Sequence, residues 1–199
     1  MEKRIRRVDV GDAPAVRDIY LPFVSDSATS FEVVPPTVAE MEGRIEGLLT
    51  QYPWLVFEAD GKVLGYAYAT SHRTRRAYQW CVEVSVYVHA NARQCGVGRA
   101  LYTALFEILR RQGYVNAYAG ITLPNAVSVG LHESLGFTPI GVFERAGFKL
   151  GNWHDVLWLQ LRLSEDPTPI PEPLPAGGLF QEARIATLLQ TCAHAVKLA

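Results

Sequence analysis

The stretch that decides the fold is Val82-Glu83-Val84-Ser85-Val86-Tyr87-Val88, followed shortly by Arg93-Gln94-Cys95-Gly96-Val97-Gly98-Arg99-Ala100-Leu101. In the first segment valines alternate with polar residues, which is the two-residue period of a strand with one apolar face. In the second segment, glycines let the backbone approach a ligand closely, and apolar residues then recur at helical spacing until Gly113. The pattern therefore predicts a strand, a glycine loop and the start of a helix.

The start of this predicted helix is typical of an anion site. Free backbone N–H groups and the helix dipole together hold a pyrophosphate without any basic side chain. Two nucleotide motifs are excluded, because the P-loop needs Lys-Ser or Lys-Thr after its last glycine and the dinucleotide fingerprint needs a third glycine. The alternative is a glycine turn that serves only the geometry of a strand-to-helix connection.

The remaining pattern, R-x-x-G-x-G from Arg93 to Gly98, resembles the acetyl-CoA pyrophosphate signature of the GNAT superfamily of N-acetyltransferases. Downstream segments resemble the second half of the GNAT core in order and spacing: Gln112-Gly113-Tyr114, Ile121-Thr122-Leu123-Pro124-Asn125, Ser128, Leu131-His132-Glu133 and Gly136-Phe137. The resemblance runs over roughly residues 4 to 163, which is the length of a whole domain.

One branch of this superfamily is especially similar. Val82-Glu83, together with Lys149-Leu150-Gly151-Asn152-Trp153-His154-Asp155-Val156, resembles the phosphinothricin and methionine sulfoximine N-acetyltransferases. Val84 departs from the pattern, because relatives often carry a small or polar residue there. Because of this departure, the resemblance does not define the shape of the pocket beside residue 84.

Composition fits a small soluble enzyme. The chain has 199 residues with 49% hydrophobic content, enough for one core, and its formal net charge of -1 gives no general attraction for nucleic acid or anionic membranes. No apolar run is long enough to span a bilayer, and the charged start Met1-Glu2-Lys3-Arg4 leads into a strand, so we expect a cytoplasmic protein. Cys81, Cys95 and Cys192 fit a reducing compartment and form no zinc pattern, so we expect no metal.

Local signals predict the elements that precede the central strand. We expect a first strand from Arg4 to Val8, a helix that is capped by Asp12 and carries Pro14 in its first turn, and a helix towards Gln51. Thr37 and Glu40 form a capping box for the second helix. Asp60-Gly61 is a hairpin signal between strands at 54–59 and 62–70, and the sheet continues at 80–88.

The elements after the glycine loop complete an α/β fold. We expect a strand at 117–123, a helix from Asn125 to Gly136, and strands at 140–149 and 154–163. The GNAT resemblance implies a mixed, mostly antiparallel central sheet with helices on both faces. A catalytic domain at 1–163 is therefore followed by a C-terminal extension.

The extension has two parts. Residues 164–178 include five prolines between Asp166 and Gly178, a composition suited to an extended linker. In residues 179–199, apolar side chains recur at helical spacing, at Ile185, Leu188, Leu189, Cys192 and Val196. This segment is predicted to be an amphipathic helix docked on this or another subunit, and a frayed terminal segment is the alternative.

Acetyl transfer to an amine needs a neutral amine, because a charged amine cannot attack a thioester. Glu83 lies on the polar face just before the loop, and the corresponding glutamate of the relatives is assigned the removal of this proton. The amine pKa of about 9 to 10 lies far above a carboxylate pKa of about 4.3, so the hypothesis includes a bridging water. The alternative is a glutamate that binds a backbone amide or a partner subunit.

His132 follows Ser128 and Asn125 at spacings that place all three on one side of the predicted helix. Many GNAT enzymes have a tyrosine at this point that protonates the departing thiolate, and the phosphinothricin branch has a histidine. An imidazole pKa of about 6.5 allows either donation or acceptance of a proton. A packing or capping histidine beside Leu131 and Leu135 is the alternative.

The resemblance also implies the residues that bind acetyl-CoA. They lie at the end of the central strand, in the glycine loop and on the helix of His132: Val86, Tyr87, Val88, Arg93, Gln94, Cys95, Gly96, Val97, Gly98, Arg99, Asn125 and Ser128. Asn125 is also expected to cap its own helix.

Cations beside aromatic residues are the candidates for acceptor binding, because such groups hold a carboxylate and a polar head group. They are Arg73, Arg75, Arg76, Tyr78, Lys149, Trp153 and His154, and Phe31 matches a substrate-loop position of the family, with a place in the core as its alternative. A solvated arginine loop is the alternative for the three arginines. Trp153 and His154 have strand packing or a dimer contact as their alternative.

Together these observations predict an acetyl-CoA-dependent N-acetyltransferase that forms a homodimer and acts on the α-amine of a small amino acid. Methionine sulfoximine, methionine sulfone and phosphinothricin are the leading substrates. Acetylation of another small amine or a peptide N-terminus is one alternative. A non-catalytic CoA-binding module is the other.

Overall fold

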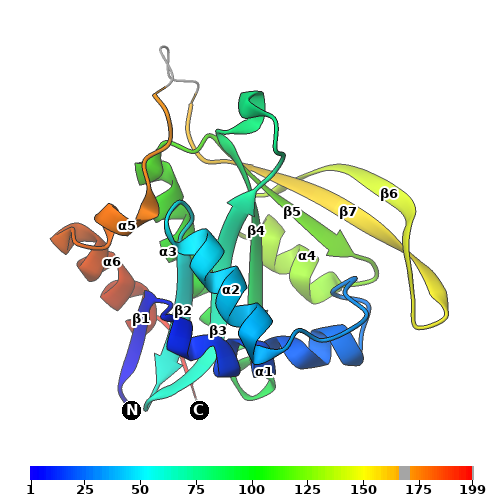
Figure 1. Cartoon of the computed structure of the whole chain (residues 1–199), viewed down its shortest axis with the longest axis horizontal. Coiled ribbons are helices and arrows are strands. Elements are labelled where there is room, and N and C mark those ends of the chain that lie inside the picture. Colours follow the sequence, from blue (N-terminus) through cyan, green and yellow to red (C-terminus); the bar gives the residue numbers. More distant parts are fainter. Residues whose placement is uncertain (166–170, 199) are drawn as a thin grey trace.

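Seven strands form one mixed sheet in the structure, a computed structural model that describes residues 1–165 and 171–198 (Figure 1). The strands are β1 Lys3–Arg7, β2 Trp54–Ala59, β3 Lys62–Ser71, β4 Cys81–Val88, β5 Asn116–Thr122, β6 Thr138–Lys149 and β7 Asn152–Arg162. Their order is β1-β2-β3-β4-β5-β7-β6, and within the described residues every neighbouring pair is antiparallel except β4 and β5. The predicted mixed, mostly antiparallel sheet is confirmed.

Helices cover both faces of this sheet, as predicted. They are α1 Ala13–Ser25, α2 Val38–Leu49, α3 Val97–Gln112, α4 Ala126–Glu133, α5 Ala176–Leu179 and α6 Ala183–His194. The helices α1 and α2 bury one apolar cluster against the side chains of Trp54, Val56 and Tyr66. The helices α3 and α6 bury a larger cluster on the opposite face, which includes Leu55, Phe57 and Val82. Because successive side chains of a strand point to opposite faces, the sheet contributes to two apolar cores, one on each face.

The N-terminal half agrees with its local signals except at Asp12. Thr37 and Glu40 form the predicted capping box of α2, and Asp60 and Gly61 make the hairpin turn with φ values of 45° and 76°. Asp12 occupies the predicted N-cap position of α1, but its side chain makes no cap hydrogen bond. Its carboxylate instead accepts from both terminal nitrogens of Arg6, at 2.6 Å and 2.8 Å. A bidentate guanidinium outcompetes the helix amides for these oxygens.

The C-terminal extension packs on the same chain. In α6 the side chains of Ile185, Leu189 and Cys192 are buried in the larger apolar cluster, next to β1 and α3. Beyond the helix, Lys3 Nζ donates to the Val196 carbonyl at 2.8 Å and the Lys197 N–H donates to the Cys95 carbonyl at 2.9 Å. The extension therefore reaches the glycine loop.

The part of the predicted linker that precedes α6 also makes contacts. Trp80 Nε1 donates to the Pro171 carbonyl at 2.8 Å, and residues 176–178 belong to the short helix α5. Residues 166–170 of the predicted linker, and residue 199 at the end of the predicted helix segment, lie outside the described residues.

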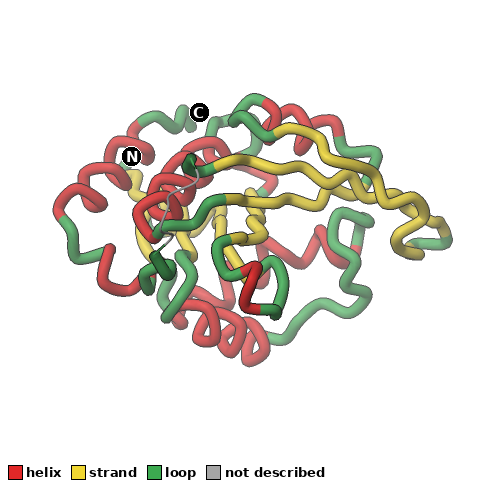
Figure 2. The backbone as a smooth tube through the Cα atoms, turned by 90° about the horizontal axis from the view of Figure 1, so that it is seen from above, coloured by secondary structure: helices red, strands yellow, loops and turns green. Residues whose placement is uncertain are grey.

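The β6–β7 hairpin projects past the rest of the molecule (Figure 2). Large apolar side chains on this arm are exposed, among them Ile140, Val142, Phe143, Phe148 and Trp153. Among the described residues, no helix is long and apolar enough to cross a membrane. Nor does this part of the chain contain a group of three or more His, Cys, Asp or Glu side chains that could hold a metal ion.

Candidate active site

The strands β4 and β5 separate in the middle of the sheet (Figure 1). A narrow pocket lies between them. Their parallel pairing joins Cys81, Val82 and Glu83 to residues 116–118 and extends no further in the described structure. The pocket has a volume of about 60 Å³ and is lined by residues 84–87 of β4, residues 119–122 of β5, and Tyr102, Asn125, Ser128 and His132. The gap therefore gathers side chains from β4, β5, α3 and α4.

The glycine loop ends at the start of α3, beside this pocket. Gly96 is the N-cap residue with φ of 88°, a left-handed conformation that favours glycine, and no side chain caps the helix. A Cβ atom on Gly98 would lie 3.2 Å from Leu131 Cδ2, so α3 and α4 approach closely there. Uncapped N–H groups at a helix start fit the pyrophosphate of acetyl-CoA.

The basic residues of the loop make contacts within the protein. Arg99 donates to the Ser134 hydroxyl at 2.6 Å and so joins α3 to the end of α4. The Arg93 guanidinium lies 5.2 Å from the ring centroid of Phe23. Gln94 has a positive φ of 62°, Val97 is buried in the apolar cluster, and Cys95 packs against that cluster. A phosphate bound at this helix start would therefore contact mainly backbone N–H groups and fewer charged side chains.

The predicted contacts from β4 divide between the two faces of the sheet. The Tyr87 ring packs against Tyr20 and Phe23 at centroid distances of 5.0 Å and 5.1 Å. Val86 and Val88 pack against the larger cluster on the other face. Of these three residues, Val86 and Tyr87 line the pocket between β4 and β5.

Glu83 lies where β4 and β5 begin to separate. Its Oε1 accepts a hydrogen bond from His72 Nδ1 at 2.9 Å, and its side chain remains 37% exposed. The His72 ring stacks on Tyr118 with centroids 4.5 Å apart. Sequence reasoning missed His72, because this contact joins two strands and has no local signal.

His132 is 3% exposed and is held at both ring nitrogens. Its Nδ1 lies 2.8 Å from the Ser128 carbonyl, which can only accept, so Nδ1 carries the proton. Its Nε2 therefore accepts from the Tyr102 hydroxyl at 3.2 Å. Burial lowers the pKa of His132, and the hydrogen bond to Ser128 opposes this shift. The neutral imidazole is paired with Tyr102, which sequence reasoning also missed because it has the spacing of a core residue.

Asn125 caps α4 as predicted, since its side chain accepts from the Ser128 N–H at 3.1 Å. The Ser128 hydroxyl lies 3.5 Å from His132 Nδ1. The N-cap and one side of α4 therefore place Asn125, Ser128 and His132 along the pocket.

The predicted acceptor residues fall into separate groups. Arg73, Arg75, Arg76 and Tyr78 line a cavity of about 530 Å³, where Arg76 forms an ion pair with Glu172 at 2.5 Å. The ring centroid of Tyr78 lies 5.9 Å from that of His72, so the arginine loop comes near Glu83.

The other predicted acceptor residues lie near β6 and β7. Lys149 is buried and its Nζ donates to the Ser30 carbonyl at 2.6 Å, while His154 Nε2 donates to the Lys149 carbonyl at 3.0 Å. Phe31 packs directly over the backbone of Gly147. Trp153 is 53% exposed on the projecting arm. The structure does not bring these residues into one cluster with the arginines.

Comparisons with known proteins agree with this geometry. The model of the acetyltransferase (GNAT) domain family matches residues 5–158. The chain is 42% identical over 170 residues to the phosphinothricin N-acetyltransferase of Streptomyces viridochromogenes, over 85% of this chain and 92% of that protein. It is 36% identical over 169 residues to the L-methionine sulfoximine/L-methionine sulfone acetyltransferase of Salmonella typhimurium, over 83% of this chain and 97% of that protein.

A solved structure has a similar fold. The crystal structure of a GNAT superfamily phosphinothricin acetyltransferase from Sinorhizobium meliloti in complex with acetyl-CoA matches with a TM-score of 0.81 and 33% identity, over 87% of this chain and 94% of that chain. The predicted family and cosubstrate are therefore confirmed. With a glycine loop that suits a pyrophosphate and a split sheet that leads to Glu83, the chain belongs to the GNAT acetyltransferase family and is an acetyl-CoA-dependent N-acetyltransferase.

Proposed function

We propose that this protein acetylates the α-amine of a small amino acid, with methionine sulfone, methionine sulfoximine and phosphinothricin as leading acceptors. The names of the relatives in Streptomyces viridochromogenes and Salmonella typhimurium support this substrate class. The observation that carries the proposal is the position of Glu83, which has a partly exposed carboxylate where β4 and β5 separate.

Glu83 is the proposed acceptor of the amine proton, directly or through one water. His72 donates to one carboxylate oxygen and orients the group. The exposed part of the side chain leaves Glu83 accessible to an amine in the gap. Acetyl-CoA, when bound, supplies the activated thioester.

His132 is proposed to act as a proton relay through Tyr102. Its Nδ1 is tied to a backbone carbonyl, so the exchangeable position is Nε2, which faces the Tyr102 hydroxyl. Both side chains line the pocket between β4 and β5. A proton that reaches the Tyr102 hydroxyl from the pocket can be passed on to Nε2, which carries none in the neutral ring.

The pyrophosphate is proposed to lie on the glycine loop, with Arg93, Gln94, Cys95, Gly96, Val97, Gly98 and Arg99 around it. Asn125, Ser128 and the β4 residues Val86, Tyr87 and Val88 are the proposed contacts closer to the thioester. The uncapped start of α3 and the open edge of β4 support this assignment.

Arg73 and Arg75 are the proposed contacts for the acceptor's carboxylate. Within the described residues, neither forms an ion pair, whereas Arg76 binds Glu172. Their loop reaches His72 through Tyr78, which places free guanidinium groups on the Glu83 side of the molecule.

We also propose a cytoplasmic homodimer. The exposed apolar side chains of the β6–β7 arm form a surface of the kind that is covered by another subunit. Sedimentation analysis of the wild type tests this part, and a monomer at micromolar concentration would contradict it.

A thiol-release assay with acetyl-CoA tests the proposed function. The screen covers the common amino acids, their sulfone and sulfoximine analogues, phosphinothricin and a panel of peptides. Acceptor-dependent release with amino acids supports the proposal. Faster release with peptides would favour a peptide N-terminus as the acceptor, and binding of acetyl-CoA without release would favour a non-catalytic module.

A further inference from the structure

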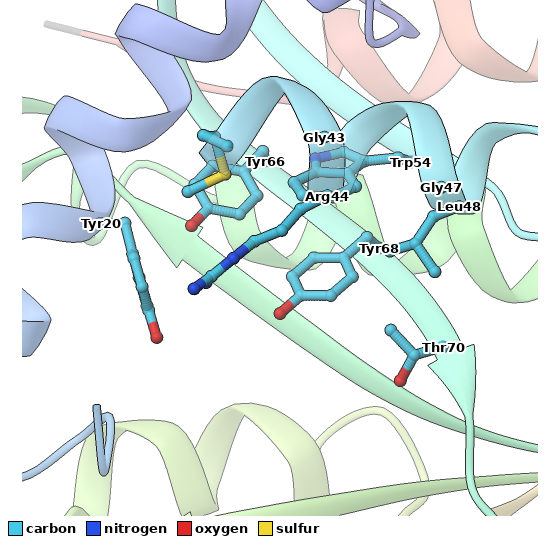
Figure 3. A pocket seen from close by; sticks show the side chains of 10 residues that line it. Tyr20, Gly43, Arg44, Gly47, Leu48, Trp54, Tyr66, Tyr68 and Thr70 are labelled. Carbon is cyan, nitrogen blue, oxygen red and sulfur yellow. The ribbon is translucent and has the colours of Figure 1, made fainter. Parts of the chain in front are cut away.

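A groove lies between α2 and β3, on the face of the sheet that carries Glu83 (Figure 3). Its volume is about 380 Å³. The side chains of Tyr66, Tyr68 and Thr70 form its floor, since alternate residues of β3 point to one face. The helix α2 forms the opposite wall.

Two glycines of α2 keep this groove open. Gly43 and Gly47 are one helical turn apart and both line the groove. A Cβ atom built on either glycine would meet no other atom within 4 Å, so packing against the protein does not require glycine here. Each glycine in a helix interior costs about 1 kcal/mol relative to alanine. The missing side chains therefore maintain open space, which a ligand can occupy.

The groove leads to the catalytic carboxylate. Thr70 lines one end of the groove and lies directly opposite Glu83 in the β3–β4 register. Such cross-strand neighbours have Cβ atoms about 4.5 to 5.5 Å apart. Along the groove, the rings of Tyr68 and Trp54 stack with centroids 4.4 Å apart and present an apolar surface. An amine beside Glu83 can thus place a substituent on this aromatic floor.

An ion pair determines the charge of the groove. Arg44 extends from α2 between Tyr20 and Tyr68 (Figure 3). Its guanidinium donates to both carboxylate oxygens of Glu32, at 2.7 Å and 3.0 Å. Glu32 also accepts from the Tyr20 hydroxyl at 3.0 Å. The positive charge of Arg44 is therefore already compensated when the groove is empty.

We propose that this groove binds the side chain of the acceptor amino acid, and that the Glu32–Arg44 ion pair makes it prefer an uncharged side chain over an anionic one. This inference rests on the proposed acetylation of amino acids. An anionic side chain would have to compete with Glu32 for Arg44, whereas a neutral sulfone side chain lies on the aromatic floor without breaking the ion pair.

The first test fills the groove. Gly47→Leu adds a side chain where no protein atom interferes, and Gly130→Leu is the matched control, because Gly130 lies in α4 and also has open space around its Cβ position. For Gly47→Leu we expect kcat/KM for methionine sulfone to fall about tenfold or more, while kcat/KM for alanine changes by less than about twofold. Gly130→Leu is expected to leave both values unchanged.

The second test changes the charge. Glu32→Gln keeps the shape of the side chain and leaves Arg44 with its positive charge uncompensated. We expect the ratio of kcat/KM for phosphinothricin to kcat/KM for methionine sulfone to rise about tenfold. Glu46→Gln removes a carboxylate from an exposed position of α2 and is expected to leave this ratio unchanged.

The outcomes separate this inference from the proposed function. If the wild type acetylates amino acids but Gly47→Leu affects alanine and methionine sulfone equally, or affects neither, the groove does not bind the side chain. An unchanged acceptor ratio in Glu32→Gln would contradict the role of the ion pair. If the wild type acetylates no amino acid, the proposed function fails first, and the inference fails with it.

Discussion

The Tyr102 hydroxyl donates to His132 Nε2 across 3.2 Å, and this contact joins α3 to α4 at the wall of the pocket between β4 and β5. The second ring nitrogen, Nδ1, is bonded to the Ser128 carbonyl. Because both partners are buried, His132 is held as a neutral imidazole.

This arrangement predicts a pH dependence of stability. Burial lowers the pKa of His132 in the folded protein, so the folded state binds fewer protons than the unfolded chain, in which the imidazole pKa is about 6.5. The contribution of His132 is therefore present above about pH 6.5 and is lost as the pH falls through the lowered pKa.

We expect His132→Gln to reduce the free energy of unfolding by about 1–3 kcal/mol at about pH 7.5, because it disturbs a buried hydrogen-bonded pair. The difference from the wild type should narrow at about pH 5.5. Urea denaturation at the two pH values measures this change. The variant His194→Gln, which replaces an exposed histidine elsewhere in the chain, is the control. A His132→Gln difference that widens at low pH would contradict the neutral assignment.

If Glu83 is the base, its replacement should lower kcat and leave the binding of acetyl-CoA unchanged. Glu83→Gln keeps the shape of the side chain but cannot take a proton, so kcat should fall about 10²- to 10⁴-fold. The acetyl-CoA dissociation constant should stay within about twofold, because Glu83 is placed on the acceptor side. Steady-state kinetics and calorimetry check the two values. A fully active variant would show that another group removes the proton.

His72 offers a companion test of the same carboxylate. His72→Phe keeps a ring that can stack on Tyr118 but removes the hydrogen bond to Glu83. We expect a smaller fall in kcat than for Glu83→Gln, with the acetyl-CoA dissociation constant unchanged, because Glu83 keeps its carboxylate but loses the contact that orients it. Weaker binding of acetyl-CoA together with an equally large fall in kcat would indicate a purely structural role of His72.

The proposed pyrophosphate site at the glycine loop can be tested by adding a charge while keeping the shape of the new side chain the same. Gly96 has a left-handed φ of 88°, a conformation that Asn and Asp tolerate better than other side chains. Gly96→Asp places a negative charge at the proposed pyrophosphate site, and Gly96→Asn is its neutral counterpart. We expect the aspartate variant to bind acetyl-CoA about tenfold or more weakly than the asparagine variant. Equal affinities by calorimetry would remove the pyrophosphate from this helix start.

The C-terminal extension is expected to affect the cosubstrate through Cys95. The Lys197 N–H donates to the Cys95 carbonyl, next to Gly96. Lys197→Pro removes this donor, whereas Lys197→Ala retains it. We predict that only the proline variant raises the acetyl-CoA KM, by about threefold to tenfold for one hydrogen bond. The acceptor KM should stay constant in both variants, and equal acetyl-CoA KM values would show that this contact does not support the loop.

Signals confined to one segment predicted the corresponding structures well. The alternation in β4, the hairpin turn at Asp60-Gly61, the capping box at Thr37 and the cap at Asn125 each depend on neighbouring residues, and all appear in the structure. The family resemblance supplied the mostly antiparallel character of the sheet and the helices on both of its faces. Physical reasoning from the residues alone reached only an α/β fold with a mixed sheet.

Contacts between distant residues could not be predicted in this way. His72 and Glu83 meet across two strands, and Tyr102 and His132 come from two helices. Lys149, a predicted acceptor residue, donates to the Ser30 carbonyl in a buried position, a contact that joins residues far apart in the sequence. For Asp12, the helix-cap signal was outweighed by Arg6, whose position depends on β1. Tertiary context decided each of these positions.

The measurement that tests the central claim most directly is thiol release from acetyl-CoA with methionine sulfone as acceptor, with mass spectrometry of the product. The account predicts release that depends on the acceptor, a product acetylated on the α-amine, and little turnover of peptides, since a pocket that binds a free carboxylate has no space for a continuing chain. No acceptor-dependent release with methionine sulfone, methionine sulfoximine or phosphinothricin, or faster turnover of peptides than of all three, would contradict it.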